Sequence, residues 1–249
     1  MASSIAPVAP TSSPPLRRGI RYEGLLSPQR LQESSVLVVG CGAIGRRVAM
    51  AWAEMGIGTL VLFDDDTVNT ENLGTQGWRP SQLGVFKTTA LADDLASVNP
   101  ECHVVDCRFR KTSLAKAQAT IVHLCVDTME CRRVLVESIG STPEEARGWW
   151  EAPGGPRIVV DSRMGALYSR TAAIWDEESR ASYLSELYTD SEVEVPMCTL
   201  RATGFMAGVG ANIAVGTAAL WLGRGLPPMP RDIGVGADGW RTANLSGGH

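Results

Sequence analysis

The most constraining feature of the sequence is a glycine-rich turn between an apolar run and a helical segment. Residues 36–39 read Val-Leu-Val-Val, as in a buried strand, and residues 40–45 read G-x-G-x-x-G. At these positions Gly40 permits a tight turn, Gly42 lets a phosphate approach the backbone, and Gly45 lets the helix pack closely on the strand. Because the start of a helix presents free N–H groups and a positive dipole end, the turn predicts a nucleotide site.

The rest of the chain continues the alternation of strands and helices. Apolar runs typical of strands occupy residues 60–63, 103–106, 121–126 and 157–161, with a weaker alternation at 167–175. Helical composition occupies residues 28–32, 43–55, 85–98, 129–139 and 204–222. This order predicts an α/β fold of the Rossmann-like, doubly wound type, with a mainly parallel sheet and right-handed crossovers.

Composition predicts three parts. Residues 1–19 are rich in Pro, Ser and Ala and predict a disordered arm. Residues 20–222 predict one domain, within which the acidic stretch near 189–203 predicts a crossover loop. Residues 223–249 carry many prolines and glycines and predict an irregular tail.

Bulk properties exclude several function classes. The formal net charge of −4 supplies no basic face for nucleic acid. No run reaches the roughly 20 apolar residues of a membrane span, since glycines interrupt residues 204–222. The first residues lack the apolar core of a secretory signal, so a cytoplasmic protein with reduced thiols is expected. The six cysteines form no C-x-x-C pair and histidines number three, so no zinc is expected.

A carboxylate follows at the position that a nucleotide site requires. The run at 60–63 ends at Asp64, about twenty residues beyond the glycine turn, where a carboxylate accepts hydrogen bonds from ribose hydroxyl groups. By themselves the turn and Asp64 indicate only that a nucleotide binds, and an NAD(P)-dependent oxidoreductase would be the default interpretation.

Motifs later in the sequence indicate a different class of nucleotide-binding protein. Residues 62–76 resemble the signature of the ThiF/MoeB and ubiquitin-activating (E1-like) adenylyltransferase family, in which a strand ends in D-x-D-x-V and leads to N-L-x-R-Q. Residues 84–87 are similar to the family's G-x-x-K, the next helix ends in Asn99-Pro100, and Asp127 follows a later strand as the family's aspartate does. The resemblance runs in register over about residues 34–140.

The resemblance implies an ATP-dependent enzyme that adenylates the C-terminal glycine of a ubiquitin-like or sulfur-carrier protein. It implies a sheet with additional antiparallel strands, Mg²⁺ held by Asp127, and catalytic roles for Asp127 and Lys87. The nucleotide-binding residues that it implies are Gly40, Gly42, Ala43, Gly45, Asp64, Asp66, Asn72, Gln76 and Lys87. The chemistry requires such a set, because a carboxylate attacking an α-phosphate brings two anions together.

Simpler roles remain open for three of these residues. Asp127 could cap the helix that follows it, Lys87 could be a solvated helix residue, and Asn72 could be a turn residue.

The chain also departs from the family pattern. Thr75 stands where the family has arginine, and threonine cannot bind phosphate bidentately. Either Arg46, Arg47 or Arg21 supplies the cation, or adenylation is weak or lost and the chain is a non-catalytic binding protein of the ThiF fold.

A second resemblance surrounds Cys198. Residues 196–201 are similar to the P-x-C-T-[LI]-[KR] motif at the thioester-forming cysteine of ubiquitin-activating enzymes. The resemblance implies that Cys198 accepts the acyl group as a nucleophile. One alternative is that Cys198 is a small buried apolar residue. The other is that the enzyme transfers sulfur to the adenylate and forms no thioester. Arg163 could contact the incoming peptide or pair with Asp161. A homodimer and a conjugating enzyme are further partners that the resemblance implies.

Overall fold

The computed structural model describes residues 20–108, 113–140, 142–151, 157–165, 167–189, 203–225, 231–236 and 239–244. Eight strands in this part form one sheet in the order β3-β2-β1-β4-β5-β6-β7-β8. They are β1 (Ser35–Val39), β2 (Thr59–Phe63), β3 (His103–Cys107), β4 (Ile121–Leu124), β5 (Ile158–Met164), β6 (Tyr168–Ile174), β7 (Arg231–Gly236) and β8 (Gly239–Asn244). The first five pair in parallel, and β6, β7 and β8 pair antiparallel.

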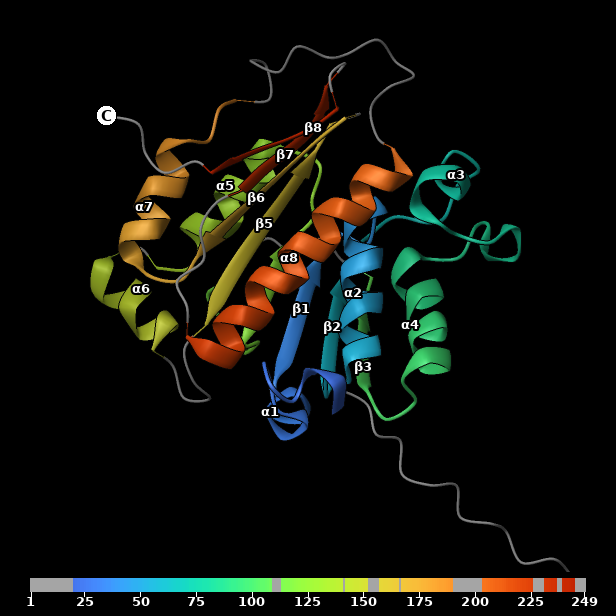
Figure 1. Cartoon of the computed structure of the whole chain (residues 1–249), viewed down its shortest axis with the longest axis horizontal. Helices are drawn as coiled ribbons and strands as arrows, with labels where there is room; N and C mark the ends of the chain where they lie inside the picture. Colours follow the sequence, from blue (N-terminus) through green and yellow to red (C-terminus); the bar gives the residue numbers. More distant parts are fainter. Residues whose placement is uncertain are drawn as a thin grey trace, which may run out of the picture.

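Helices cover both faces of this sheet (Figure 1). They are α1 (Pro28–Glu33), α2 (Ala43–Met55), α3 (Asn72–Gln76), α4 (Lys87–Val98), α5 (Met129–Glu137), α6 (Pro143–Trp150), α7 (Glu177–Ser185) and α8 (Gly204–Arg224), with short 3₁₀ helices at Ile20–Tyr22 and Pro80–Gln82. One buried cluster joins α2, α4 and α8 to the sheet, and a second joins α5, α6 and α7 to it. The predicted doubly wound sheet with additional antiparallel strands is confirmed.

The central strand shows why the sheet needs two layers of helices. Val36 and Val38 of β1 belong to one buried cluster, whereas Leu37 and Val39 belong to the other. Successive side chains of a strand point to opposite faces, so a continuous apolar run is stable only where both faces are covered.

The predicted strands and helices agree with the structure up to position 222, but several elements were not predicted. Helix α6 begins after the N-cap Thr142, and α7 begins after the N-cap Asp176. The third unpredicted element is helix α3, which has five residues and ends the loop that begins at Asp64. The caps are recognisable in the sequence, but the helices are short and weakly patterned.

The prediction of an irregular tail over residues 223–249 is wrong in part. Residues 231–236 and 239–244 form β7 and β8, which extend the sheet from β6. Glycine-rich segments have low intrinsic strand preference, and pairing to an existing edge overrides that preference. The predicted arm at 1–19 and most of the predicted crossover loop lie outside the described residues.

Helix α8 is long and apolar enough to span a membrane by length and composition. In this structure, however, 56% of its most apolar window is buried. It packs on α2, β5 and β6, as a core helix does, and crosses the sheet in Figure 1.

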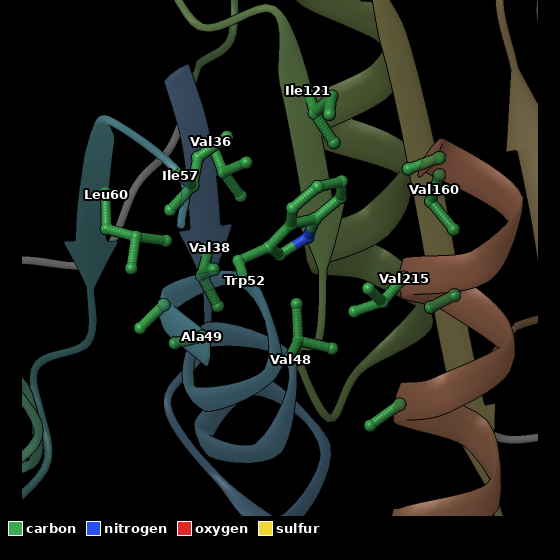
Figure 2. Packing of buried hydrophobic residues seen from close by; sticks show 14 of the residues in the cluster. Val36, Val38, Val48, Ala49, Trp52, Ile57, Leu60, Ile121, Val160 and Val215 are labelled. Atoms are coloured by element: carbon green, nitrogen blue, oxygen red, sulfur yellow. The ribbon is translucent and has the colours of Figure 1, made fainter. Parts of the chain in front are cut away.

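A polar pair lies inside the first cluster. The Trp52 side chain of α2 projects toward β4 among aliphatic side chains (Figure 2), and its Nε1–H donates to Nε2 of His123 at 2.9 Å. Both residues are fully buried. An imidazole that accepts at Nε2 is neutral, and burial lowers the pKa of His123 to about 3.

This buried imidazole predicts acid sensitivity. The folded pKa of His123 lies below the ordinary value of 6.5, so the unfolded chain binds a proton first as the pH falls. Between pH 6.5 and 3 the His123 contribution should lower the free energy of unfolding by about 1.4 kcal/mol per pH unit. Urea unfolding across this range gives the free energy of unfolding as a function of pH, and its slope should be smaller for His123→Gln than for wild type. Equal slopes would contradict the assignment of the pH dependence to His123.

Candidate functional site

The glycine turn lies where the strand order reverses. The chain passes from β1 to β2 and β3 on one side, then returns to β4 on the other side of β1. In open α/β sheets this switch point forms the ligand crevice at the carboxyl ends of the strands. The Cys125 N–H donates to Val39 O at 2.8 Å, so Gly40 and the segment after β4 lie side by side.

The three motif glycines have different local requirements. Gly40 has a positive φ of 92°, and a Cβ there would lie 2.6 Å from Cys125 O. A Cβ on Gly45 would lie 1.8 Å from Gly40 O. Gly42 is the N-cap of α2 and has open space, with the Gln76 amide nitrogen 4.0 Å from its hypothetical Cβ. The turn therefore packs tightly at Gly40 and Gly45 and is open at Gly42, where α2 begins at Ala43.

Asp64 holds the glycine turn in place. Its Oδ2 accepts the Cys41 N–H at 2.6 Å, and its Oδ1 accepts the Asp66 N–H at 2.8 Å. Burial raises the pKa of Asp64, although these donors and the charge of Lys87 oppose the shift. The sequence predicted a ribose ligand, and this bracing role was missed.

Lys87 is not a solvated helix residue. It opens α4, is only 6% exposed, and its Nζ donates to Asp66 Oδ2 at 2.7 Å. Asp66 in turn donates its N–H to Asp64, and Asp64 accepts the Cys41 N–H, so hydrogen bonds connect the ammonium to the glycine turn. The carboxylates of Asp64, Asp65 and Asp66 offer oxygens within 4.8 Å of one another, a donor set suited to Mg²⁺.

Helix α3 brings two amide side chains to this edge. Oδ1 of Asn72 accepts the Asn69 N–H at 3.1 Å, as expected of a turn residue, so this half of the side chain is occupied. Oε1 of Gln76 accepts the Trp78 indole N–H at 2.9 Å, which directs the amide nitrogen of Gln76 toward Gly42.

Asp127 does not cap the helix that follows it. Helix α5 has Thr128 as its N-cap, and the Thr128 hydroxyl accepts the Cys131 N–H at 3.2 Å. The Asp127 side chain is exposed, and it has no hydrogen-bond or ion-pair partner in the part of the chain that the structure describes. Cys125 and Val126, the two residues before Asp127, lie against Gly40. A free carboxylate next to that segment fits a role in binding Mg²⁺ with a nucleotide.

An ionic cluster around the buried Asp94 was missed by sequence reasoning. Asp94 of α4 accepts from Arg46 at 2.8 Å, from Arg79 at 2.5 Å and from Gln82 at 3.1 Å. The Arg46 guanidinium also lies 4.9 Å from the ring centroid of Trp78. These contacts fix the loop after α3 against α2 and α4, and the wide sequence separation of the partners gave no signal.

Arg163 pairs with Asp161. The buried Asp161 carboxylate accepts from Arg163 at 2.6 Å and from Arg132 at 2.8 Å. Burial alone would raise the pKa of Asp161, but the two arginines outweigh it and hold that pKa below its usual value. Among the two roles considered for Arg163, pairing with Asp161 is confirmed.

Five cysteines lie among the described residues, and none of them forms a disulfide with another: Cys41, Cys102, Cys107, Cys125 and Cys131. Burial raises the pKa of Cys41 well above its usual value, which disfavours the thiolate form that a nucleophile needs. Cys198 lies outside the described residues, and its role stays a prediction.

Comparisons with known proteins agree with this geometry. Ubiquitin-like modifier-activating enzyme 5 of Caenorhabditis elegans is 32% identical over 139 residues, covering 50% of this chain and 32% of that protein. The Dictyostelium discoideum enzyme is 31% identical over 140 residues, covering 50% of this chain and 36% of that protein. The chain thus spans about a third of the length of these curated relatives.

Solved structures share the fold at low identity. Crystal structures of E. coli MccB with succinimide and of PaaA align with TM-scores of 0.65 and 0.64, each at 17% identity. The first covers 94% of this chain and 72% of MccB, and the second 88% of this chain and 66% of PaaA. MccB with ATP has a TM-score of 0.62 at 16% identity, covering 88% of this chain and 65% of that one. Because the model of the ThiF family matches residues 17–230, this chain belongs to the ThiF family.

Proposed function

We propose that this chain uses ATP to adenylate the C-terminal glycine of a small ubiquitin-like or sulfur-carrier protein. The observation that carries the proposal is that Lys87 and Gln76, from different helices, both reach the glycine turn: hydrogen bonds through Asp66 and Asp64 connect Lys87 to it, and the Gln76 amide faces Gly42. A dinucleotide site would use the turn and Asp64 but gives no reason for a buried ammonium there. The names of the curated relatives, which are ubiquitin-like modifier-activating enzymes, support the substrate class.

The reaction joins two anions, and the site residues act on that charge. The carboxylate of the carrier attacks the α-phosphate, the bond to pyrophosphate breaks, and an acyl-adenylate forms. The N–H groups at the start of α2 bind phosphate oxygens, Lys87 adds a positive charge, and Gln76 donates through its amide nitrogen. Mg²⁺ entering with ATP would neutralise further charge, and Asp127 would hold it.

The second step that we propose is thioester formation. The Cys198 thiolate attacks the acyl carbon, AMP leaves, and a carrier thioester remains. A sulfur-transferring relative would pass sulfur to the same adenylate, and the motif around Cys198 favours the thioester. A homodimer, a conjugating enzyme and a cytoplasmic location belong to this proposal.

A non-catalytic binding protein is the alternative, and Thr75 is the observation that favours it, since the chain lacks the family's arginine there. An oxidoreductase is disfavoured, because it gives no reason for the buried Lys87 side chain or for the Gln76 amide that faces Gly42.

Exchange of labelled pyrophosphate into ATP tests the proposal. Exchange is expected only with a carrier that ends in a glycine carboxylate and should vanish when the carrier ends in a carboxamide. ATP binding without exchange with any such carrier would favour the binding protein, and binding of NAD in place of ATP would favour the oxidoreductase.

Replacement of Cys198 separates the two steps. Cys198→Ala should keep pyrophosphate exchange within about twofold of wild type, because adenylation does not use the thiol, and should lose any reductant-sensitive carrier conjugate. Non-reducing gels with and without thiol detect that conjugate, and Cys131→Ala is the control. A conjugate that persists in Cys198→Ala would show that another group is the acceptor.

A further inference from the structure

Arg47 occupies a junction beside the glycine turn. It lies one helical turn after the start of α2, and its side chain folds back so that Nη1 donates to Ala43 O at 2.7 Å and to Thr75 O at 3.1 Å. A Cβ on Gly204 would lie 3.5 Å from Nη2. The partly buried guanidinium therefore lies between α2, α3 and the start of α8, three helices that contact one another (Figure 1).

This arginine carries a charge without a counter-ion. Its neighbour Arg46 pairs with Asp94, and Lys87 pairs with Asp66. Arg47 has no carboxylate partner in the part of the chain that the structure describes, and only carbonyl oxygens accept from it. Burial first, and Arg46 second, lower the pKa of Arg47. A partly buried cation without a counter-ion is stabilised by an arriving anion.

We propose that Arg47 is the arginine that binds the phosphates of ATP, in place of the family's arginine at position 75. This inference rests on the proposed function. The bond from Arg47 to Thr75 O puts the guanidinium next to position 75, and the following residue, Gln76, faces Gly42.

The donor inventory of Arg47 fits this role. A guanidinium has five N–H donors, and the two on Nη1 are used by the carbonyls of Ala43 and Thr75. The N–H on Nε and the two on Nη2 have no partner among the described residues. One edge of the guanidinium thus anchors the side chain, and the other edge presents a planar fork, the geometry that binds phosphate oxygens bidentately.

The test compares Arg47→Met with Arg157→Met. Arg157 is a matched control, since it also donates to a backbone carbonyl, Ala117 O at 2.5 Å, and burial also lowers its pKa. Arg47→Met should weaken Mg·ATP binding at least about tenfold, as expected for a charge-assisted hydrogen bond, with adenosine binding unchanged. Arg157→Met should change neither affinity. Titration calorimetry gives both affinities, and melting temperatures report any loss of folding.

Two further variants separate charge from packing. Arg47→Lys keeps the charge but not the fork, and its ATP affinity should fall between wild type and Arg47→Met. Thr75→Arg in the Arg47→Met background should recover ATP affinity. Equal loss of ATP and adenosine binding, or ATP affinity of wild-type strength in Arg47→Met, would overturn the proposal. Failure of the wild-type protein to bind ATP would instead overturn the proposed function and the inference with it.

Discussion

Replacing Asp127 with alanine is expected to lower pyrophosphate exchange at least about a hundredfold, the loss typical of removing one group that stabilises charge in a transition state. The Asp127 carboxylate is exposed and unpartnered among the described residues, and Asp127 comes directly after Cys125 and Val126, whose backbone lies against Gly40. A carboxylate in that place has no structural bond to lose, so its removal should affect Mg²⁺ binding and leave the fold intact. Exchange assays over a range of Mg²⁺ concentrations measure the effect.

The neighbouring residue provides the control for Asp127→Ala. Thr128→Ala removes the N-cap of α5 and should lower the free energy of unfolding by about 1 kcal/mol while exchange stays close to wild type. Asp127→Asn should lose exchange as Asp127→Ala does, because an amide lacks the negative charge. Full exchange in Asp127→Asn would show that the charge of Asp127 takes no part in the mechanism. Loss of exchange in Thr128→Ala as large as in Asp127→Ala would show that a disturbance of α5 causes the loss.

Most of the sheet and the position of the site could be predicted because their signals are local. The run at 36–39, the glycine turn and the helix after it are consecutive in the sequence, and their chemistry dictates one arrangement. The order of Asn72, Lys87 and Asp127 in the sequence then follows the order in which loops reach the carboxyl edge of the sheet. Parallel strands bring those loops together without any further information.

The roles of individual side chains were harder to predict because they depend on distant partners. That Asp64 binds ribose stays a prediction, whereas the N–H groups of Cys41 and Asp66 that its oxygens accept were not predicted. The Asp94 cluster joins residues that lie far apart in the sequence, and no short pattern reports such pairing. Strands β7 and β8 exist through pairing to β6, which their glycine-rich sequences do not show.

The glycines of the turn give the second large expected effect. Gly45→Ala should lower the free energy of unfolding by about 3 kcal/mol or more, because its Cβ would lie 1.8 Å from Gly40 O and neither backbone can move without displacing the other. The clash involves a carbonyl fixed between β1 and α2, so no rotamer change relieves it. Urea unfolding followed by circular dichroism measures the loss, and nucleotide binding should fall with the folded fraction.

Two other glycines separate folding from binding. Gly42→Ala meets nothing closer than the Gln76 amide at 4.0 Å, so the protein should fold normally, yet the methyl group would occupy the space that a phosphate needs and ATP affinity should fall. Gly74→Ala in α3 meets nothing within 4 Å and should leave both properties intact, with a slight gain from helix preference. If Gly42→Ala bound ATP as tightly as wild type, phosphate would not approach the backbone at this turn, and the glycines would serve only to pack α2 on the sheet.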